Sequence, residues 1–244
     1  MMHLFRLVPV LLLLGLLLAC SDGRRSIEKY YFPSGELAAG RVYAYAGVEG
    51  DTSDRRYWYY RAIPRDSGLF LVGTQYDRYF QVVQMLREKI VASGSLARES
   101  FLYETDTATG VARQIPAVIE SPDLFPFKVT DSLGVFLFRM HYQPPGDSLA
   151  TIYVIRNRRF MGDGPDFEFN GKRFPTIRFG VREAIGHDRE GASEVEGEGE
   201  EWYARDLGLV FYRRSFSAGK IRYAYRLQET FAMPELERRA GQGK

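Results

Sequence analysis

The chain has 244 residues, of which 45% are hydrophobic and 26% are charged, so it can bury a core and is not disordered by composition. Its 33 Lys and Arg nearly balance 31 Asp and Glu, which argues against a dedicated nucleic-acid binder. The single cysteine excludes an internal disulfide. The 16 Tyr and 17 Phe are unusual and favour β-sheet, because aromatic rings suit pleated, half-buried surfaces.

The N-terminus carries an apolar run at residues 7–19. Its 13 residues are fewer than the roughly 20 that a bilayer-spanning helix needs, and the weakly basic start is typical of a signal peptide. Leu17-Leu18-Ala19-Cys20 then resembles the bacterial lipobox, in which a peptidase cuts before a cysteine that carries diacylglycerol. The resemblance implies cleavage between Ala19 and Cys20 and lipid attachment at Cys20. The alternative is a buried cysteine at the end of an apolar helix.

A lipobox cysteine carries three acyl chains, and more than one chain makes a stable membrane anchor. In enterobacteria, Asp directly after the cysteine favours the inner membrane. Ser21 stands there in this chain, which favours the outer membrane, facing the periplasm. We therefore expect four segments: a removed signal peptide (1–19), a tether (20–26), a single β-rich domain (27–231) and a polar tail (232–244).

In chain order, period-two runs between turn residues predict strands in the first part of the domain at 26–32, 40–48, 57–63 and 69–76. The segment 77–94 is ambiguous. Its apolar residues approach helical spacing, but they also alternate on one strand face, and strand-like neighbours on both sides favour a strand.

Further along the chain, 96–104 and 111–119 predict a hairpin around 105–110, and 121–127 predicts an apolar linker with two prolines. The strand 134–142 has one continuous apolar face, which carries Phe136, Phe138, Met140 and Tyr142. Asn170-Gly171 favours a type I′ turn between short arms. The remaining strands are predicted at 149–160, 176–186, 200–206, 207–216 and 220–231.

About a dozen strands with short turns predict an all-β, mostly antiparallel fold, because parallel strands need long crossovers. We expect a large curved sheet or half-open barrel with few or no long helices after the signal peptide. An integral outer-membrane barrel is the less favoured alternative. It needs a lipid-facing band without charge, but Arg178 and Arg182 share one face of their strand and Glu183 lies on the other.

Motifs for catalysis, cofactors and metals are weak. No Gly-x-Ser-x-Gly elbow surrounds a serine, and His141 and His187 are the only histidines after the signal peptide. Residues 162–166 fit a turn better than a calcium loop. An acidic row, which we expect to be solvated rather than a cation site, consists of Glu194, Glu196, Glu198 and Glu200. We expect no catalytic residues, no cofactor and no metal.

The cation- and aromatic-rich segment 55–63 could stack sugars. It could equally be one packed strand, with Trp58 and Tyr60 on one face and Tyr57 and Tyr59 on the other.

The segment 200–214 has an aromatic pair, a short turn and a Gly-Leu-Val that opens the next strand; the positions concerned are Trp202, Tyr203, Ala204, Gly208, Leu209 and Val210. It resembles a segment near the end of exported bacterial proteins of unknown function with a long, curved antiparallel sheet. That architecture is similar to the LolA/LolB-type lipoprotein carriers, whose half-barrel holds acyl chains. Those carriers also have helices that close the sheet, and none is predicted here. We expect a buried Trp202 and a Gly208 with positive φ or a close neighbour.

Two functions remain open. In the first, the chain is a non-enzymatic, lipid-anchored envelope protein that binds an apolar ligand or lipid in a mainly apolar cleft of about 300–1,000 Å³. In the second, it is a structural or assembly lipoprotein that acts through contacts with protein or cell wall. The sequence does not name ligand-binding residues. Its expected partners are the membrane, through the acyl anchor, and a lipid or envelope protein, with no nucleic acid.

Overall fold

A computed structural model of the protein describes residues 23–105, 110–130, 134–145, 147, 149–189 and 193–242. The predicted signal peptide, Ala19 and Cys20 lie outside the described residues. Within them, no helix is long and apolar enough to cross a membrane.

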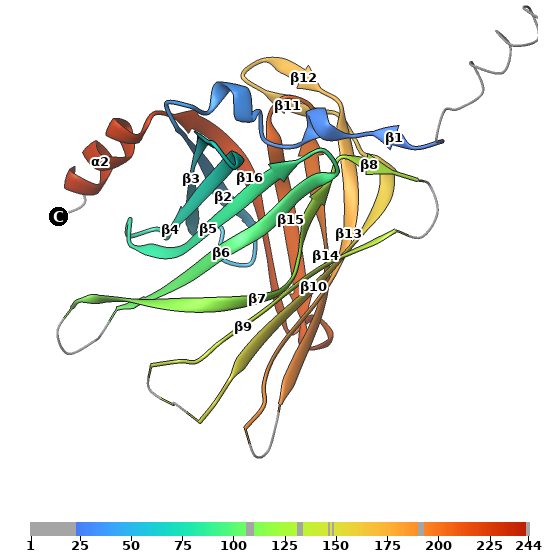
Figure 1. Cartoon of the computed structure of the whole chain (residues 1–244). Coiled ribbons are helices and arrows are strands. Elements are labelled where there is room, and N and C mark those ends of the chain that lie inside the picture. Colours follow the sequence, from blue (N-terminus) through green and yellow to red (C-terminus); the bar gives the residue numbers. More distant parts are fainter. Residues whose placement is uncertain are drawn as a thin grey trace, which may run out of the picture.

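Twelve antiparallel strands form a closed barrel (Figure 1). Strand β9 closes it, because it pairs with β7 on one side and with β10 on the other. In their order around the barrel the strands are β10 (Ile152–Asp163), β13 (Thr176–His187), β14 (Glu194–Ala204), β15 (Gly208–Phe216), β16 (Ile221–Phe231), β2 (Arg41–Glu49), β3 (Arg55–Arg65), β4 (Gly68–Tyr76), β5 (Val82–Val91), β6 (Gly94–Thr105), β7 (Ala112–Pro126) and β9 (Val135–Tyr142).

The predicted all-β, antiparallel fold is confirmed, and the sheet is a complete barrel rather than a half-open one. The ambiguous segment 77–94 contains strand β5, as the neighbouring strands indicated. The predicted apolar linker at 121–127 is wrong. Most of it belongs to β7, which stays paired with β6 through Phe125 and Pro126 beyond two register shifts.

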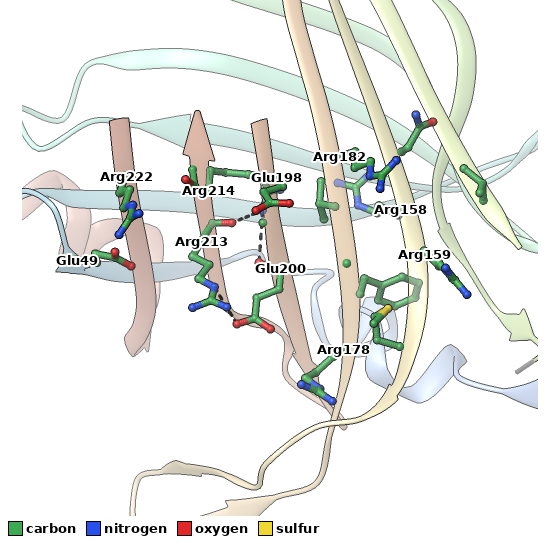
Figure 2. Close-up of a pocket in the computed structure, with 18 residues that line it drawn as sticks. Glu49, Arg158, Arg159, Arg178, Arg182, Glu198, Glu200, Arg213, Arg214 and Arg222 are labelled. Atoms are coloured by element: carbon green, nitrogen blue, oxygen red, sulfur yellow. Dashed lines mark hydrogen bonds and ion pairs between the residues drawn. The ribbon is translucent and has the colours of Figure 1, made fainter. Parts of the chain in front are cut away.

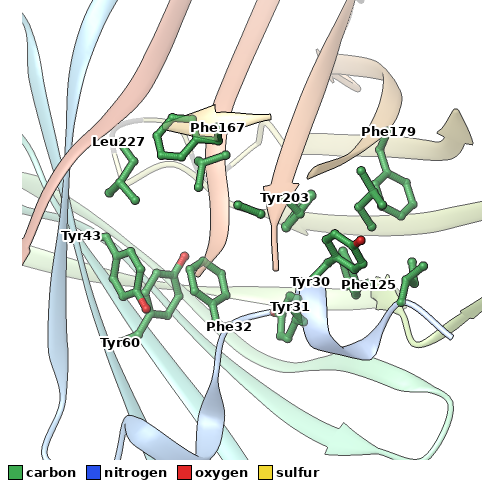
Figure 3. Packing of buried hydrophobic residues seen from close by; sticks show 14 of the residues in the cluster. Tyr30, Tyr31, Phe32, Tyr43, Tyr60, Phe125, Phe167, Phe179, Tyr203 and Leu227 are labelled. Carbon is green, nitrogen blue, oxygen red and sulfur yellow. The ribbon is translucent and has the colours of Figure 1, made fainter. Parts of the chain in front are cut away.

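The N-terminal segment lies across one end of the barrel (Figure 1) and packs its aromatic side chains against those of the barrel (Figure 3). It consists of the short strand β1 (Arg25–Ser26), which pairs with β8 (Lys128–Val129), and the 3-10 turns η1 (Glu28–Tyr30) and η2 (Ser34–Glu36). The Phe32 ring lies 4.0 Å from that of Tyr60, and the Tyr31 ring lies 4.7 Å from that of Phe125. We call residues 27–37 the plug.

A small hairpin lies at the same end of the barrel (Figure 1). It pairs β11 (Phe167–Phe169) with β12 (Lys172–Phe174), and both Phe167 and Phe169 are buried in the main core. Asn170 and Gly171 have φ of 52° and 73°, which agrees with the predicted type I′ turn.

The segment expected to be a polar tail contains helix α2 (Met233–Gln242). Leu236 on this helix is 2% exposed and belongs to a second core outside the barrel wall, together with Val42, Ala44 and Tyr57. Arg239 binds Glu229 of β16 at 2.5 Å and lies over the Phe231 ring. This helix was not predicted, because its ten residues are mostly polar and charged.

Candidate binding cavity

Some charged residues occupy strand positions whose side chains face the interior of the barrel. Arg156 and Arg158 lie on the same face of β10 as Phe160, whose ring packs against the Phe179 core residue of β13. Cross-strand pairing places Arg156 opposite Glu183, and Arg158 opposite Val181. Because side chains on a strand alternate between its two faces, these arginines must point inward with the aromatic core.

Five of the inward side chains form one ion-pair cluster, which we call the interior cluster. Arg158 donates two hydrogen bonds to Glu201, at 2.8 and 3.3 Å, and Arg156 donates two to Glu183, at 3.0 and 2.9 Å. Arg214 joins the two pairs, because its Nε donates to Glu183 at 3.1 Å and its Nη2 donates to Glu201. Three guanidinium groups therefore share two carboxylates.

The cluster shifts the acidity of its carboxylates. Burial alone would raise the pKa of Glu183, but Arg156 and Arg214 outweigh it and lower this pKa to about 2. Burial opposes ionisation of Glu201 as well, yet Arg158 and Arg214 hold its pKa far below the usual range. Both carboxylates are therefore ionised at neutral pH. The Tyr203 hydroxyl donates to Glu201 at 2.9 Å and adds a further hydrogen bond.

Glu88 is a third buried carboxyl group, on β5 across the barrel. The hydroxyls of Tyr31 and Ser95 both donate to its Oε2 atom. Burial raises the pKa of Glu88, and the two hydrogen bonds only partly oppose this shift. Tyr31 belongs to the plug, so this contact ties the plug to the barrel wall.

The interior cluster, Glu88 and the plug surround a cavity of about 400 Å³. This volume lies in the range predicted from the sequence, but a mainly apolar lining is not what the structure has. The predicted apolar strip does face the interior and contributes Phe138, yet polar groups (guanidinium, carboxyl, amide and phenol) line the wall about as much as apolar groups do. The polar and aromatic lining residues include Arg56, Arg156, Arg158, Arg214, Glu88, Glu201, Gln75, Gln84, Trp58, Tyr60, Tyr212, Tyr223 and Tyr225.

A second hollow, of about 700 Å³, lies on the outer face of the same strands (Figure 2). Arginines from four strands, β10, β13, β15 and β16, surround it, among them Arg159, Arg178 and Arg222. Arg213 binds Glu200 across it at 3.0 Å. These groups are solvated, so their charges interact weakly compared with those of the interior cluster.

The two histidines considered as catalytic candidates lie apart. His141 contacts the Glu120 carboxylate at 2.7 Å on the barrel surface. His187 lies 3.1 Å from the Ser193 hydroxyl through Nε2, but among the described residues nothing pairs with its Nδ1. Asp188 accepts a hydrogen bond from the Thr151 amide and does not orient His187. A serine nucleophile needs a base that a third group orients, and this arrangement lacks that group in the described part of the chain.

The remaining candidates are surface features. The acidic row lies on β14, where Glu194 accepts a hydrogen bond from Tyr153 and Glu200 binds Arg213. In the 162–166 turn, Asp163 binds Arg25 at 2.6 Å. The described residues contain no group of three or more His, Cys, Asp or Glu that could hold a metal ion.

The aromatic strand is arranged as predicted. Trp58 and Tyr60 stack on the inner face of β3, with centroids 5.6 Å apart, and line the cavity. Tyr57 lies on the other face, stacked on Phe80 and packed in the core under α2.

The segment at 200–214 is only partly as expected. Tyr203, Ala204 and Val210 are buried, whereas Trp202 is half-buried, on the face of β14 opposite Glu201, with its ring 4.6 Å from Phe211. Gly208 meets both expectations, with φ of 92° and an ideal Cβ position 2.5 Å from the Phe32 ring.

The interior cluster was not predicted from the sequence. The residues that could have indicated it are charges on the apolar face of a predicted strand, as in the alternation Val154, Arg156, Arg158, Phe160. Glu183, Glu201 and Arg214 follow the same pattern on their strands. A charge at such a position indicates a buried partner, since an unpaired ion inside a protein is strongly unfavourable.

No protein-family profile matches the chain, and no curated protein matches it. Among solved structures it is similar to "a putative lipoprotein" from Parabacteroides distasonis, with a TM-score of 0.53 and 12% identity over 83% of this chain and 98% of that one. It also matches "a putative exported protein with YmcC-like fold" from Bacteroides fragilis, with a TM-score of 0.48 and 12% identity over 82% and 98% of the two chains. The Parabacteroides protein and this chain share a fold.

Proposed function

We propose that this protein is a non-enzymatic, lipid-anchored component of the bacterial cell envelope whose barrel interior binds a small ligand. The observation that carries the proposal is the cavity of about 400 Å³ inside a barrel that is plugged at one end. Cavities of this size with a few convergent polar groups are typical of small-molecule sites.

The envelope location is supported by the lipobox-like residues that end at Cys20 and by the fold shared with the Parabacteroides protein. Ser21 after the cysteine favours the outer membrane, with the barrel in the periplasm. The absence of a catalytic role is supported by the separate surface positions of His141 and His187.

The ligand expected from the sequence was apolar, by analogy with the acyl-chain carriers. The lining of the cavity favours a more polar ligand, because the tail of an acyl chain offers no acceptor to the Nη1 atom of Arg158, which has no partner among the described residues.

The lipid anchor is tested by labelling cells with radioactive palmitate. The wild type should incorporate label and fractionate with the membrane, and Cys20→Ser should incorporate none and keep its signal peptide. Label in the Cys20→Ser variant at the wild-type level would exclude the lipoprotein assignment.

The second candidate function is a structural or assembly lipoprotein that acts through surface contacts. The outer arginine-lined hollow favours it, because an exposed positive surface attracts acidic partners. One double variant distinguishes the two functions. Replacing Arg159 and Arg178 by Gln should abolish the binding of an acidic partner at the outer hollow and leave ligand binding in the cavity unchanged.

A further inference from the structure

We infer that the cavity is a site for a compact anionic ligand, a carboxylate or phosphate group on a ring-sized body, whose charged group docks at the guanidinium of Arg158. This inference rests on the proposed function and adds the chemistry of the ligand.

The charges of the lining are the first observation. Four guanidinium groups face the cavity, whereas only two carboxyl groups, those of Glu88 and Glu201, do so. Glu201 is already shared by Arg158 and Arg214. Within the interior cluster, the three arginines and two glutamates leave one positive charge without a counterion.

The second observation is a guanidinium group with one nitrogen that lacks a hydrogen-bond partner. Arg158 is 6% exposed, and its Nη1 atom is buried without a hydrogen-bond partner among the described residues. Its Nε and Nη2 atoms are both used by Glu201. A buried donor on a charged group is costly to leave unpaired, so an acceptor from a ligand would stabilise the site.

Glu88 does not supply that acceptor. Both hydroxyl groups that contact it, from Tyr31 and Ser95, donate to the same carboxyl oxygen. Among the described residues Glu88 makes no ion pair, although it lines the same cavity as Arg158. Burial raises the pKa of Glu88, and the hydrogen bonds from Ser95 and Tyr31 and the charge of Arg158 oppose this shift.

The aromatic walls indicate the shape of the ligand. Trp58 and Tyr60 stack at an interplanar angle of 10°, and Tyr212 and Tyr225 stack at 22°, so flat rings line two parts of the wall. Flat ligand rings pack well on such surfaces, and phenol hydroxyls add hydrogen bonds. The volume of about 400 Å³ suits one ring with its anionic substituent.

Calorimetric titration of the full chain in detergent tests the inference. The probes are glucuronate, glucose 6-phosphate and inorganic phosphate as anions, glucose as the neutral ring, and palmitate as an anion on a long chain. Glucuronate or glucose 6-phosphate should bind at least about tenfold more tightly than glucose, because their charged group accepts a hydrogen bond from the Arg158 guanidinium that glucose cannot match. The carboxylate and phosphate probes distinguish the two sources of charge.

Arg158→Gln should lower the affinity for the anion that binds by about tenfold or more and leave the affinity for glucose unchanged. The matched control is Arg159→Gln, which removes the neighbouring charge from the outer face and should change nothing. Because Arg158→Gln could unfold the barrel, Gln84→Trp provides a second variant. It fills part of the cavity without touching an ion pair, and it should also abolish anion binding.

The inference is overturned if glucose binds as tightly as the anions, if Arg158→Gln and Gln84→Trp both retain full anion binding, or if no anion binds. Palmitate binding that is insensitive to Arg158→Gln would overturn the anionic chemistry but support a binding barrel. A lack of binding by every probe, palmitate included, would count against the proposed function as well.

Discussion

Glu201 determines whether the interior cluster is stable. It is 3% exposed and holds two guanidinium groups, those of Arg158 and Arg214, inside the barrel. Buried ion pairs add little net stability, because desolvation offsets their attraction, but removing one partner leaves an uncompensated charge. The cluster is therefore sensitive to the loss of a single carboxylate.

Glu201→Gln should lower the free energy of unfolding by about 3–5 kcal/mol, since two buried arginines lose their shared countercharge. Glu200→Gln is the matched control on the other face of β14. It breaks a partly exposed pair with Arg213 and should cost less than about 1 kcal/mol. Urea denaturation of the two variants measures the difference. Equal losses would mean that Glu201 is solvated.

Acid should destabilise the protein through the same cluster. The pKa of Glu183 is lowered to about 2 in the folded state, against 4.5 without these interactions, so its stabilisation is complete above pH 4.5 and is lost as the pH falls toward 2. This one group contributes about 3 kcal/mol. Denaturation curves at pH 6, 4 and 3 should show the loss, and Glu183→Gln should flatten it. A wild-type stability that is constant from pH 6 to 3 would contradict the assignment.

Glu88 should behave in the opposite way. Its pKa is raised on folding, so its contribution is present below the unfolded pKa and is lost as the pH rises through the folded value. Glu88→Gln keeps an acceptor for Tyr31 and Ser95 but cannot ionise. It should be as stable as the wild type at pH 4 and more stable at pH 8. Glu99→Gln, an exposed control on β6, should not show this trend.

At the scale of elements, the plug and the β14–β15 turn depend on each other. The Asp206 amide donates to the Lys29 carbonyl at 2.7 Å, and Gly208 leaves room for the Phe32 ring. This contact joins the beginning of the domain to one of its last hairpins.

Gly208→Ala should cost about 2–4 kcal/mol, because φ of 92° strains an L-residue and the new Cβ would lie 2.5 Å from Phe32. Gly171→Ala is the control: it also has positive φ, at 73°, but nothing lies within 4 Å, so about 1 kcal/mol is expected. Thermal melts compare them. If Phe32→Leu does not recover part of the Gly208→Ala loss, the ring contact is not the cause.

The elements also show what could be predicted from the sequence. Period-two alternation identified most strands, and Asn170-Gly171 identified the small hairpin, because both signals are local. Closure of the barrel depends on the pairing of β9 with β7 and with β10, which joins distant segments and leaves no local pattern. Helix α2 packs on β2 and β16 through Leu236, Met233 and the Arg239–Glu229 ion pair, and its mostly polar sequence does not reveal these contacts.

Only the volume of the cavity could be predicted. The apolar strip on β9 indicated that another part of the molecule or a ligand covers this strip. The chemistry of the cavity, however, depends on which strands face the strip across the barrel. Arg156 and Arg158 reach Glu183 and Glu201 from positions 27 and 43 residues away. Such pairs are set by register around the closed barrel, which a single sequence does not reveal.

At the scale of the whole molecule, the two ends of the barrel differ. The plug and the β11–β12 hairpin close one end, and the chain leaves from there toward its N-terminus (Figure 1). A lipid anchor at Cys20 would hold this closed end toward the membrane. The ends of the β6–β7, β9–β10 and β13–β14 pairs point the other way (Figure 1). The closed end of the barrel is therefore the end at which β1, the first strand of the described residues, lies.

We expect the barrel cavity to hold a ligand and not to be filled by the protein's own side chains. A native mass spectrum of the full chain, purified from the cells that make it, tests this when it is compared with that of Gln84→Trp. The wild type should carry a mass excess that disappears on denaturation, and Gln84→Trp should carry none. A wild-type mass that equals the acylated chain alone, or an adduct that persists in Gln84→Trp, would contradict the account.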